Sequence, residues 1–290
     1  MNRNFPFLLI LVSSILCPGG LFAQEHFDLE KRDGHFHFAA TINGAPADIM
    51  VESGIPALLV GEKIYESHLR SSDLDFQPSG QKIRLLNHLY NIIYRTDGEV
   101  RISNVIYDGP VFILEDYDGA SIPIQYLKDP VSRRSVLAID LENNSLTVGQ
   151  PIEKVNGTRF RLSFDKDLGF PVVAATVKLA TSEGDSRLKG NLIIDFGNPS
   201  LLFLLRQDKS LTKAINKKRI ELKDAYDKNG RLIAQGIYAE TVSLFGQEHH
   251  DISIGVTDQM QSIGQMGFLG TKFFTSPVVF DFDKGFMMME

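Results

Sequence analysis

Two carboxylate residues, Glu52 and Asp195, occupy closely similar apolar segments of the chain. Each follows apolar residues and is followed by one variable residue and a glycine, in MVESG (50–54) and IIDFG (193–197). An ionised carboxylate within an apolar strand costs free energy unless a partner or hydrogen bonds compensate it. Two carboxylates in contact cannot both ionise, so they share one proton; one then acts as a general base and the other as a general acid. The pattern therefore points to a paired-carboxylate site that activates water.

An internal repeat explains why the two acids have matching surroundings. MVESGIPALLV (50–60) aligns with IIDFGNPSLLF (193–203), and FAAT (38–41) aligns with VAAT (173–176), with about eight extra residues in the second copy. The third matching pair is SVLAIDLENNSLTV (135–148) and SPVVFDFDKGFMMM (276–289). The acids are 143 residues apart, and Asp140 and Asp281 of the third pair are 141 residues apart. A nearly constant offset favours two copies of one unit.

We expect the two copies to form two similar lobes, spanning residues 24–150 and 151–290. An approximate two-fold axis between the lobes brings Glu52 and Asp195 together at the base of a cleft. Glycine follows each acid because the chain must turn tightly while its backbone N–H groups approach the carboxylates.

Short β-branched and aromatic runs bounded by Gly, Asn, Asp or Pro recur throughout both copies. Examples are HFHFAATI, VRISNVI and PVFIL in the first copy, and FPVVAATV, NLIID and DISIGV in the second. Such runs predict strands, and the pairs Asn43-Gly44 and Asp97-Gly98 predict turns between them. Helix-like periodicity is limited to residues 61–69 and 208–218. We therefore expect an all-β protein.

This pattern resembles the pepsin-like aspartic peptidases and their single-lobe, retroviral-type relatives. The second copy carries LIIDFG (192–197), GFLGTKFF (267–274) and VVFDFDKG (278–285), in the family's order of acid motif, apolar-apolar-Gly segment and closing strand. The first copy carries MVESG, DGASIPIQYL (118–127) and VLAIDLENNSLTV in the same order. The resemblance covers residues 34–290. It implies the acid-protease fold, with two β-barrel-like lobes related by a pseudo-two-fold axis.

The resemblance also implies roles for particular residues. Proton sharing by two carboxylates is the established chemistry of that peptidase class, and here it assigns catalysis to Glu52 and Asp195. The motif residues that support the pair are Ser53, Gly54, Phe196 and Gly197. A peptide or protein is the expected ligand in the cleft between the lobes, and no cofactor and no metal are expected.

Three departures from the family pattern leave two functions open. Glu52 replaces Asp and adds one methylene group, Phe196 replaces a hydroxyl residue, and Ser121–Pro123 stands where apolar-apolar-Gly is expected. In one interpretation the chain is an exported aspartic peptidase with a Glu52/Asp195 dyad. In the other it has lost catalysis and keeps the cleft to bind a peptide, protein or glycan. Catalytic groups must be placed to within ~0.5 Å, so these changes bear directly on the choice.

The N-terminus has the features of an export signal. Arg3 precedes the apolar run 5–17, Pro18–Gly20 ends any helix, and the segment closes at Ala23. These features predict a signal peptide over residues 1–23 and a periplasmic or secreted product. A lipid anchor at Cys17 is disfavoured because Leu16, not a small residue, precedes it. The mature chain then has no cysteine, which excludes disulfides and thiolate chemistry.

Composition narrows the choice of partners. The net charge of −6 and the pI near 5.7 argue against broad electrostatic binding to nucleic acid or anionic lipid. The densest basic cluster, KKR at 217–219, is interpreted as a solvated helix end. No segment after the signal approaches ~18 consecutive apolar residues, so no membrane span is predicted. We expect a monomer.

Two pairs of histidines could in principle bind a metal ion. His35 and His37 share one face of a predicted strand, and His249 and His250 are adjacent. Neither pair has a third ligand at a supporting spacing, so we interpret all four as strand and loop residues.

Two further pairs of residues have structural explanations. Asp140 and Asp281 repeat as faithfully as the central acids, but each follows an apolar strand and precedes turn residues, so we interpret them as strand-end acids. Tyr90 and Tyr94 precede the predicted turn at Asp97-Gly98 and are candidates for a flap over the cleft.

Overall fold

The computed structural model describes residues 24–85, 88–149, 157–226, 232–257 and 264–289. Strands form most of this part of the chain, as the sequence predicted, and helices are few and short. The predicted signal peptide at residues 1–23 and the predicted junction at 150/151 lie outside the described residues. Within the described chain, no helix is long and apolar enough to cross a membrane.

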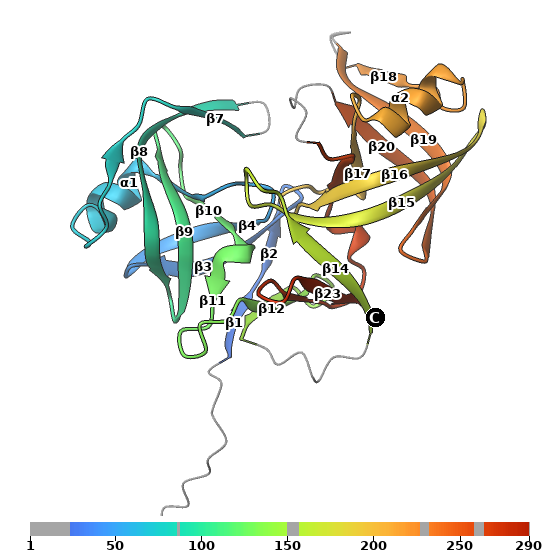
Figure 1. Cartoon of the computed structure of the whole chain (residues 1–290). Coiled ribbons are helices and arrows are strands. Elements are labelled where there is room, and N and C mark those ends of the chain that lie inside the picture. Colours follow the sequence, from blue (N-terminus) through green and yellow to red (C-terminus); the bar gives the residue numbers. More distant parts are fainter. Residues whose placement is uncertain (1–23, 86–87, 150–156, 227–231, 258–263, 290) are drawn as a thin grey trace, which may run out of the picture.

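Six strands of the first copy close into a ring, in the order β3-β4-β10-β5-β9-β8 and back to β3 (Figure 1). Its strands β4 and β10 are parallel, as are β5 and β9, and the other neighbours are antiparallel. The members of this first ring are β3 (His35–Ile42), β4 (Ala45–Glu52), β5 (Leu58–Gly61), β8 (His88–Ile102), β9 (Val105–Leu114) and β10 (Ala120–Pro123).

Six strands of the second copy close into a second ring with the same sequence of parallel and antiparallel pairs. Its order is β15-β16-β21-β17-β20-β19 and back to β15. The members are β15 (Pro171–Thr181), β16 (Gly184–Ile194), β17 (Leu202–Leu205), β19 (Leu232–Leu244), β20 (Gln247–Thr257) and β21 (Gly267–Leu269). Each strand of one ring therefore has a counterpart in the other.

A sheet segment with strands from both halves of the chain, in the order β1-β13-β12-β22-β23-β14, continues through β14 into β15 of the second ring. Its central strands are antiparallel, and Ala138 of β12 lies opposite Val279 of β22. These two residues are 141 apart, which is the offset of the repeat, so Ala138 pairs with its own counterpart. The pseudo-two-fold axis therefore passes between Ala138 and Val279. The strands are β1 (Glu25–Asp28), β12 (Val136–Asp140), β13 (Ser145–Val148), β14 (Thr158–Phe164), β22 (Val278–Asp281) and β23 (Phe286–Met289).

The remaining elements are short and lie at the edges of the rings. Helices occur in the two segments where the sequence predicted them. The strands are β2 (Glu30–Arg32), β6 (Gln77–Pro78), β7 (Lys82–Leu85), β11 (Leu127–Lys128) and β18 (Lys223–Tyr226). The helices are α1 (Glu62–Ile64), which continues as a π-helical turn (Tyr65–Leu69), α2 (Lys209–Asn216), and two 3₁₀ turns (Ile124–Tyr126 and Thr271–Phe273).

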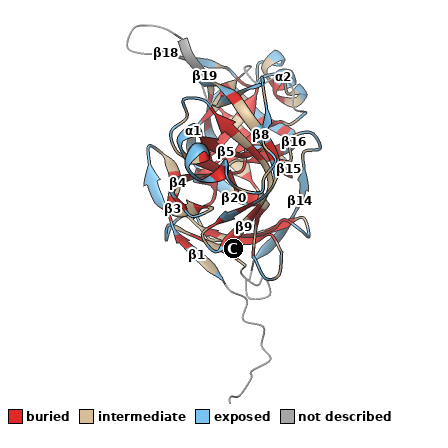
Figure 2. Ribbon diagram, turned by 90° about the vertical axis from the view of Figure 1, so that its left-hand side faces the viewer, coloured by how far each residue is buried: buried red, intermediate tan, exposed pale blue. Residues whose placement is uncertain are grey.

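Alternation of side chains along the strands fills the interior of each ring. Ile49 and Val51 of β4 and Leu58 and Val60 of β5 are fully buried in the main core, together with Ile122 of β10. Successive residues of a strand point to opposite faces, so the residues between them face outward. Figure 2 shows buried residues along the strands and exposed residues on α1 and α2. Glu52 is an outward-facing residue of this series.

The sheet registers support most of the repeat alignment and correct one part of it. Phe38 lies opposite Ile49, and Val173 lies opposite Leu192, so FAAT and VAAT occupy equivalent places. The eight extra residues extend the hairpin of β15 and β16. The alignment paired Leu59 with Leu202, but the structure shifts this match by one residue. Leu59 lies opposite Ser121 in the first ring, and the residue in the same place of the second ring is Phe203, opposite Phe268.

A buried ion pair fixes the two halves of the chain to each other. Asp281, at the end of β22, is completely buried, and its Oδ2 accepts a hydrogen bond of 2.7 Å from the Arg134 guanidinium. Its Oδ1 accepts from the Lys284 backbone N–H at 2.9 Å, and Asp140 Oδ1 accepts from Asn143 N–H at the same distance. Both acids thus cap the turn that follows their strand, which agrees with the strand-end interpretation.

Replacing Arg134 by Met should destabilise the protein by about 2 kcal/mol, because it removes the hydrogen-bonded cation of a buried carboxylate and leaves only Lys284, at 3.8 Å, as a charged partner. The matched control is Arg133→Met, whose partner Glu99 is exposed and whose loss should cost less than about 1 kcal/mol. Urea unfolding of both variants measures the difference. Equal losses for the two variants would show that the Arg134–Asp281 pair does not hold the halves together.

Candidate active site

The two central acids stand at the ends of equivalent strands. Glu52 is the last residue of β4, and Asp195 directly follows β16. Each of these strands lies between two others of its ring, so its backbone position is fixed on both sides. Glu52 is only 8 % exposed and Asp195 is half-buried.

The structure brings the two carboxyl groups into contact. Their side chains interact by a hydrogen bond, with Glu52 as the protonated partner and Asp195 as the acceptor. The Gly197 backbone N–H donates to Asp195 Oδ1 at 3.1 Å, and the backbone of Gly197 and Ser53 also interacts with the Glu52 carboxyl. The pair predicted from the repeat is therefore formed across the two lobes.

The glycine after each acid leaves room for the acid of the opposite lobe. A Cβ atom on Gly54 would lie 2.6 Å from Asp195 Oδ1, and a Cβ atom on Gly197 would overlap both carboxylate oxygens of Glu52. Real Cβ atoms do not approach oxygen so closely, so a larger residue at either position would push the pair apart. The overlap is worse at Gly197 because Glu52 carries one methylene more than Asp195.

Ser53 forms hydrogen bonds from the first lobe to both sides of Asp195. Its Oγ donates to the Ile194 carbonyl oxygen at 2.7 Å and accepts from the Phe196 backbone N–H at 3.0 Å. Ser53 is completely buried, so water does not compete for these bonds. One serine therefore fixes the backbone that carries the opposite acid.

Phe196, at the position equivalent to Ser53, cannot return these hydrogen bonds. Its buried ring stacks on Phe274, with 5.0 Å between ring centroids, and packs edge-on against Phe280 at 5.7 Å. The support between the lobes is thus polar on one side of the axis and aromatic on the other.

Burial makes the pair share a proton. It raises the pKa of Glu52 well above its ordinary value, and the charge of Asp195 and the hydrogen bond to it raise that pKa further. Burial also raises the pKa of Asp195, to about 6, although hydrogen bonds from Gly197 and Glu52 oppose the rise. Of the two acids, Glu52 is therefore the one that holds the shared proton more tightly, and Asp195 is the one that ionises first.

Two hydroxyl groups that sequence analysis missed lie beside Glu52. Ser121 of β10 is completely buried, and its Oγ is 2.5 Å from the Tyr117 hydroxyl. Strand β10 runs parallel to β4, with Pro123 opposite Glu52, so Ser121 lies on the same outward face as the acid. Burial raises the pKa of Tyr117, although the hydrogen bond with Ser121 opposes the rise. The signal in the sequence was the replacement of an expected apolar residue by serine.

The two tyrosines predicted for a flap occupy different surroundings. Tyr90 lies in β8 opposite Ile83 of β7, and its ring packs edge-on against Tyr117, with centroids 5.4 Å apart. Tyr94 lies further along β8 and stacks on Tyr65 at 5.0 Å. The β7–β8 hairpin thus connects to the acid pair through Tyr90, and its role as a flap stays a prediction.

The histidine pairs lie on strands of the two rings, and His37 lies opposite Met50 of β4, two residues from Glu52. His35 and His37 are in β3, and His249 and His250 are in β20. Among the described residues, no group of three or more His, Cys, Asp or Glu side chains is arranged to hold a metal ion.

Two surface hollows lie away from the acid pair. One, of about 280 Å³, is lined by residues that include Phe36, Leu141 and Phe274. The other, of about 440 Å³, lies along helix α2. Neither is lined by Glu52 or Asp195, so the predicted cleft between the lobes stays a prediction.

Comparisons with known proteins agree with the architecture. No protein-family model matches the chain, and no curated protein matches it in sequence. The crystal structure of aspartic proteinase from Irpex lacteus is similar to this chain, with a TM-score of 0.60 and 11 % sequence identity, over 91 % of this chain and 96 % of that chain. At this identity the likeness shows the fold alone. The protein has the two-lobed, all-β fold of the pepsin-like aspartic proteinases, as the sequence predicted.

Gly197→Ala should destabilise the protein by about 1–3 kcal/mol, because the new methyl group occupies the space of the Glu52 carboxyl. In a Glu52→Ala background the same substitution should cost much less, since the overlapping group is gone. Gly80→Ala, at an exposed glycine with open space around it, serves as control. Urea unfolding measures all four variants. An equal cost of Gly197→Ala in both backgrounds would exclude the proposed contact.

The shared proton should make stability fall as pH rises. Both acids have a higher pKa folded than unfolded, so as pH rises from about 4 through the folded pKa of Asp195, about 6, the folded state binds more protons than the unfolded state. The free energy of unfolding of the wild type should therefore decrease over this range relative to Glu52→Gln, which removes one of the two titrations. Chemical denaturation at several pH values measures it, with the exposed-site variant Glu62→Gln as control. Parallel pH curves for wild type and Glu52→Gln would contradict a raised pKa of Glu52.

Proposed function

We propose that this protein is an exported aspartic peptidase in which Glu52 and Asp195 hydrolyse peptide bonds. The observation that carries the proposal is the acid pair itself: two carboxyl groups from equivalent strands of two lobes interact with each other, and burial raises the pKa of both. Export is supported by the sequence of residues 1–23.

The protonation state assigns a role to each acid. Asp195, the charged member, takes a proton from a water molecule, whose oxygen attacks the peptide carbonyl carbon. Glu52, the neutral member, donates its proton to the carbonyl oxygen, which gives a tetrahedral diol. When the C–N bond breaks, Asp195 returns its proton to the leaving nitrogen, and Glu52 recovers one from a diol hydroxyl. Protons and charge balance over the cycle, and no cofactor takes part.

In this proposal the enzyme is a monomer. Its substrate is an extended segment of a peptide or protein, bound between the two lobes. Strand-like hydrogen bonds suit this mode, because each lobe is a sheet and recognition through the main chain tolerates many side chains. The Tyr90-bearing hairpin and the Tyr117–Ser121 hydroxyl pair lie on the first-lobe side of that site.

A second function, binding without catalysis, is favoured by one observation. Phe196 removes half of the hydrogen bonds that could fix the acid motifs across the axis, and it fills that space with an aromatic cluster. In this case the space between the lobes would hold a peptide, protein or glycan that is not cut.

Digestion of a peptide library, followed by mass spectrometry from pH 4 to pH 8, separates the two functions. We expect cleavage that increases as pH rises through about 6, where Asp195 becomes charged while Glu52 keeps its proton. Asp195→Asn and Glu52→Gln should each reduce the rate by about 10²–10⁴, the usual contribution of a general acid or base. Glu52→Asp should also reduce it, because the shorter side chain no longer reaches its place against Gly197.

Two outcomes would reject the peptidase. Cleavage that survives Asp195→Asn in a folded variant would come from other chemistry or contamination. No cleavage at any pH, with peptides still retained by the immobilised protein, would support the binding function.

A further inference from the structure

Helix α2 and the residues around it form the most basic segment of a chain that is acidic overall. Between Arg206 and Arg219 there are six basic residues and one acid, Asp208, whereas the whole chain has a net charge of −6. Asp208 is occupied as the N-cap of the helix, where its Oδ1 accepts from the Ser210 and Leu211 backbone N–H groups at 2.9 Å. The remainder of the helix surface carries no acid to balance its lysines.

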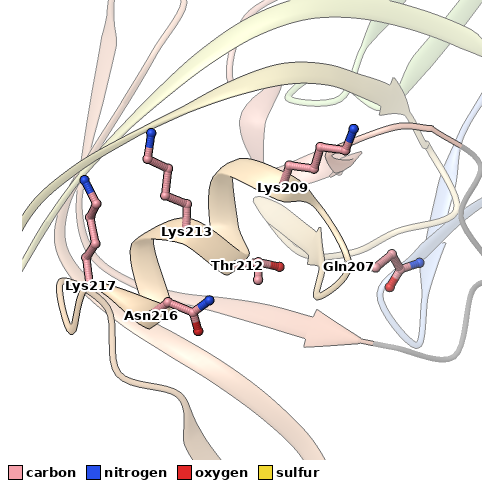
Figure 3. Close-up of a pocket in the computed structure, with 6 residues that line it drawn as sticks. All are labelled: Gln207, Lys209, Thr212, Lys213, Asn216 and Lys217. Atoms are coloured by element: carbon pink, nitrogen blue, oxygen red, sulfur yellow. The ribbon is translucent and has the colours of Figure 1, made fainter.

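The fold gathers three of these lysines into one row. The buried face of α2 is formed by Leu211 and Ala214, so the opposite face is turned outward. Lys209, Lys213 and Lys217 follow one another at intervals of four residues, about 6 Å apart along the helix axis. Figure 3 shows their side chains extending from the same side of the helix. They border a hollow of about 440 Å³, which is also lined by Gln207, Thr212 and Asn216.

The row is not explained by the stability of the protein. Like charges four residues apart destabilise a helix by some tenths of a kcal/mol per pair; Lys209 and Lys213 form such a pair within α2, and Lys217 is its C-cap. All three lysines are exposed, and none of them forms an ion pair with another residue in the described part of the chain. Lys218 and Arg219, also exposed, continue the positive charge beyond the end of the helix.

We infer that this outward face of α2, which we call the lysine face (Lys209, Lys213 and Lys217), binds the anionic headgroups of a lipid surface. Helix α2 lies at the outer end of the second lobe (Figure 1), and its three lysine side chains are exposed, so their ammonium groups can reach a flat surface. Lysines are flexible point charges suited to a diffuse layer of phosphates, whereas recognition of one phosphate group favours the fixed fork of arginine. The apolar residues of α2 are buried in the protein, so the contact is electrostatic and the helix does not insert.

The lysine face also revises an expectation from composition. The net charge argued against attraction to anionic lipid, but attraction over a short range depends on the local charge within about a Debye length, ~10 Å at moderate ionic strength. The inference does not depend on whether the acid pair is catalytic.

Sedimentation of the protein with lipid vesicles tests the inference. The probes are neutral phosphatidylcholine vesicles and vesicles that also contain phosphatidylglycerol, at low and at physiological ionic strength. The test variant is Lys209→Gln/Lys213→Gln/Lys217→Gln, since glutamine keeps the helix propensity and removes the charge. The control changes three exposed lysines of other elements, Lys63→Gln/Lys82→Gln/Lys178→Gln, and gives the same net charge.

We expect the wild type and the control to bind the anionic vesicles and not the neutral ones, with weaker binding at higher salt. The test variant should show a partition coefficient lower by about a hundredfold, because each basic side chain near an anionic surface contributes roughly a factor of five. Circular dichroism and thermal unfolding confirm that each variant is folded. Absence of wild-type binding at low salt, equal binding by the test variant, or binding of soluble heparin or polyglutamate without binding of vesicles would each overturn the inference.

Discussion

The contact between the Glu52 and Asp195 carboxyl groups imposes the strictest requirement on this structure. Two carboxylates removed from water repel each other, and contact is tolerated only when one of them keeps its proton. Two strands from distant parts of the sequence must therefore meet within hydrogen-bond distance and stay there. The glycines that follow the acids allow the two carboxyl groups to meet, because each glycine leaves space for the opposite carboxyl. Ser53 keeps Asp195 in place, because it is hydrogen-bonded to the backbone on both sides of that residue.

The two lobes support the pair in different ways, and the difference gives its members different properties. Glu52 is the longer and more deeply buried acid, and burial next to a charged neighbour keeps it neutral. Asp195 receives hydrogen bonds from Gly197 and Glu52, which favour its charged form. A symmetric pair would need an external event to decide which acid keeps the proton. Here side-chain length and the unequal support from Ser53 and Phe196 make that decision in the folded protein.

The sequence was sufficient to predict the architecture and the acid pair, because both are expressed in the repeat. The offset between MVESG and IIDFG is nearly the same as that between Asp140 and Asp281. Such agreement indicates that the matching segments form equivalent strands of the two lobes. The offset was less reliable within loops. Leucine pairs at 58–59 and 201–202 look equivalent, but one extra residue after Asp195 moves Leu202 to the place of Leu58. Only hydrogen-bonded register, which depends on neighbouring strands, distinguishes the two alignments.

Other features of the site could not be predicted because they depend on distances between segments that are not repeated. The Tyr117–Ser121 hydroxyl pair has no counterpart, since Phe268 occupies the place of Ser121 in the second ring. The basic cluster at 217–219 is evident in the sequence, but its connection with Lys209 and Lys213 is not, because polar and apolar residues separate the lysines in the sequence. In the hydroxyl pair and in the lysine face, the folded backbone brings together side chains that are not adjacent in the sequence.

The pairing of Ala138 with Val279 at the axis has a consequence for assembly. Strands β12 and β22 are counterparts in the repeat, and they are also each other's hydrogen-bonded neighbours. Each half of the chain therefore contributes an equivalent strand edge to this pairing. Halves of two different molecules could meet along this seam as readily as halves of one, with an acid delivered by each. The covalent connection between the halves raises their effective concentration, which favours pairing within one chain over exchange between two.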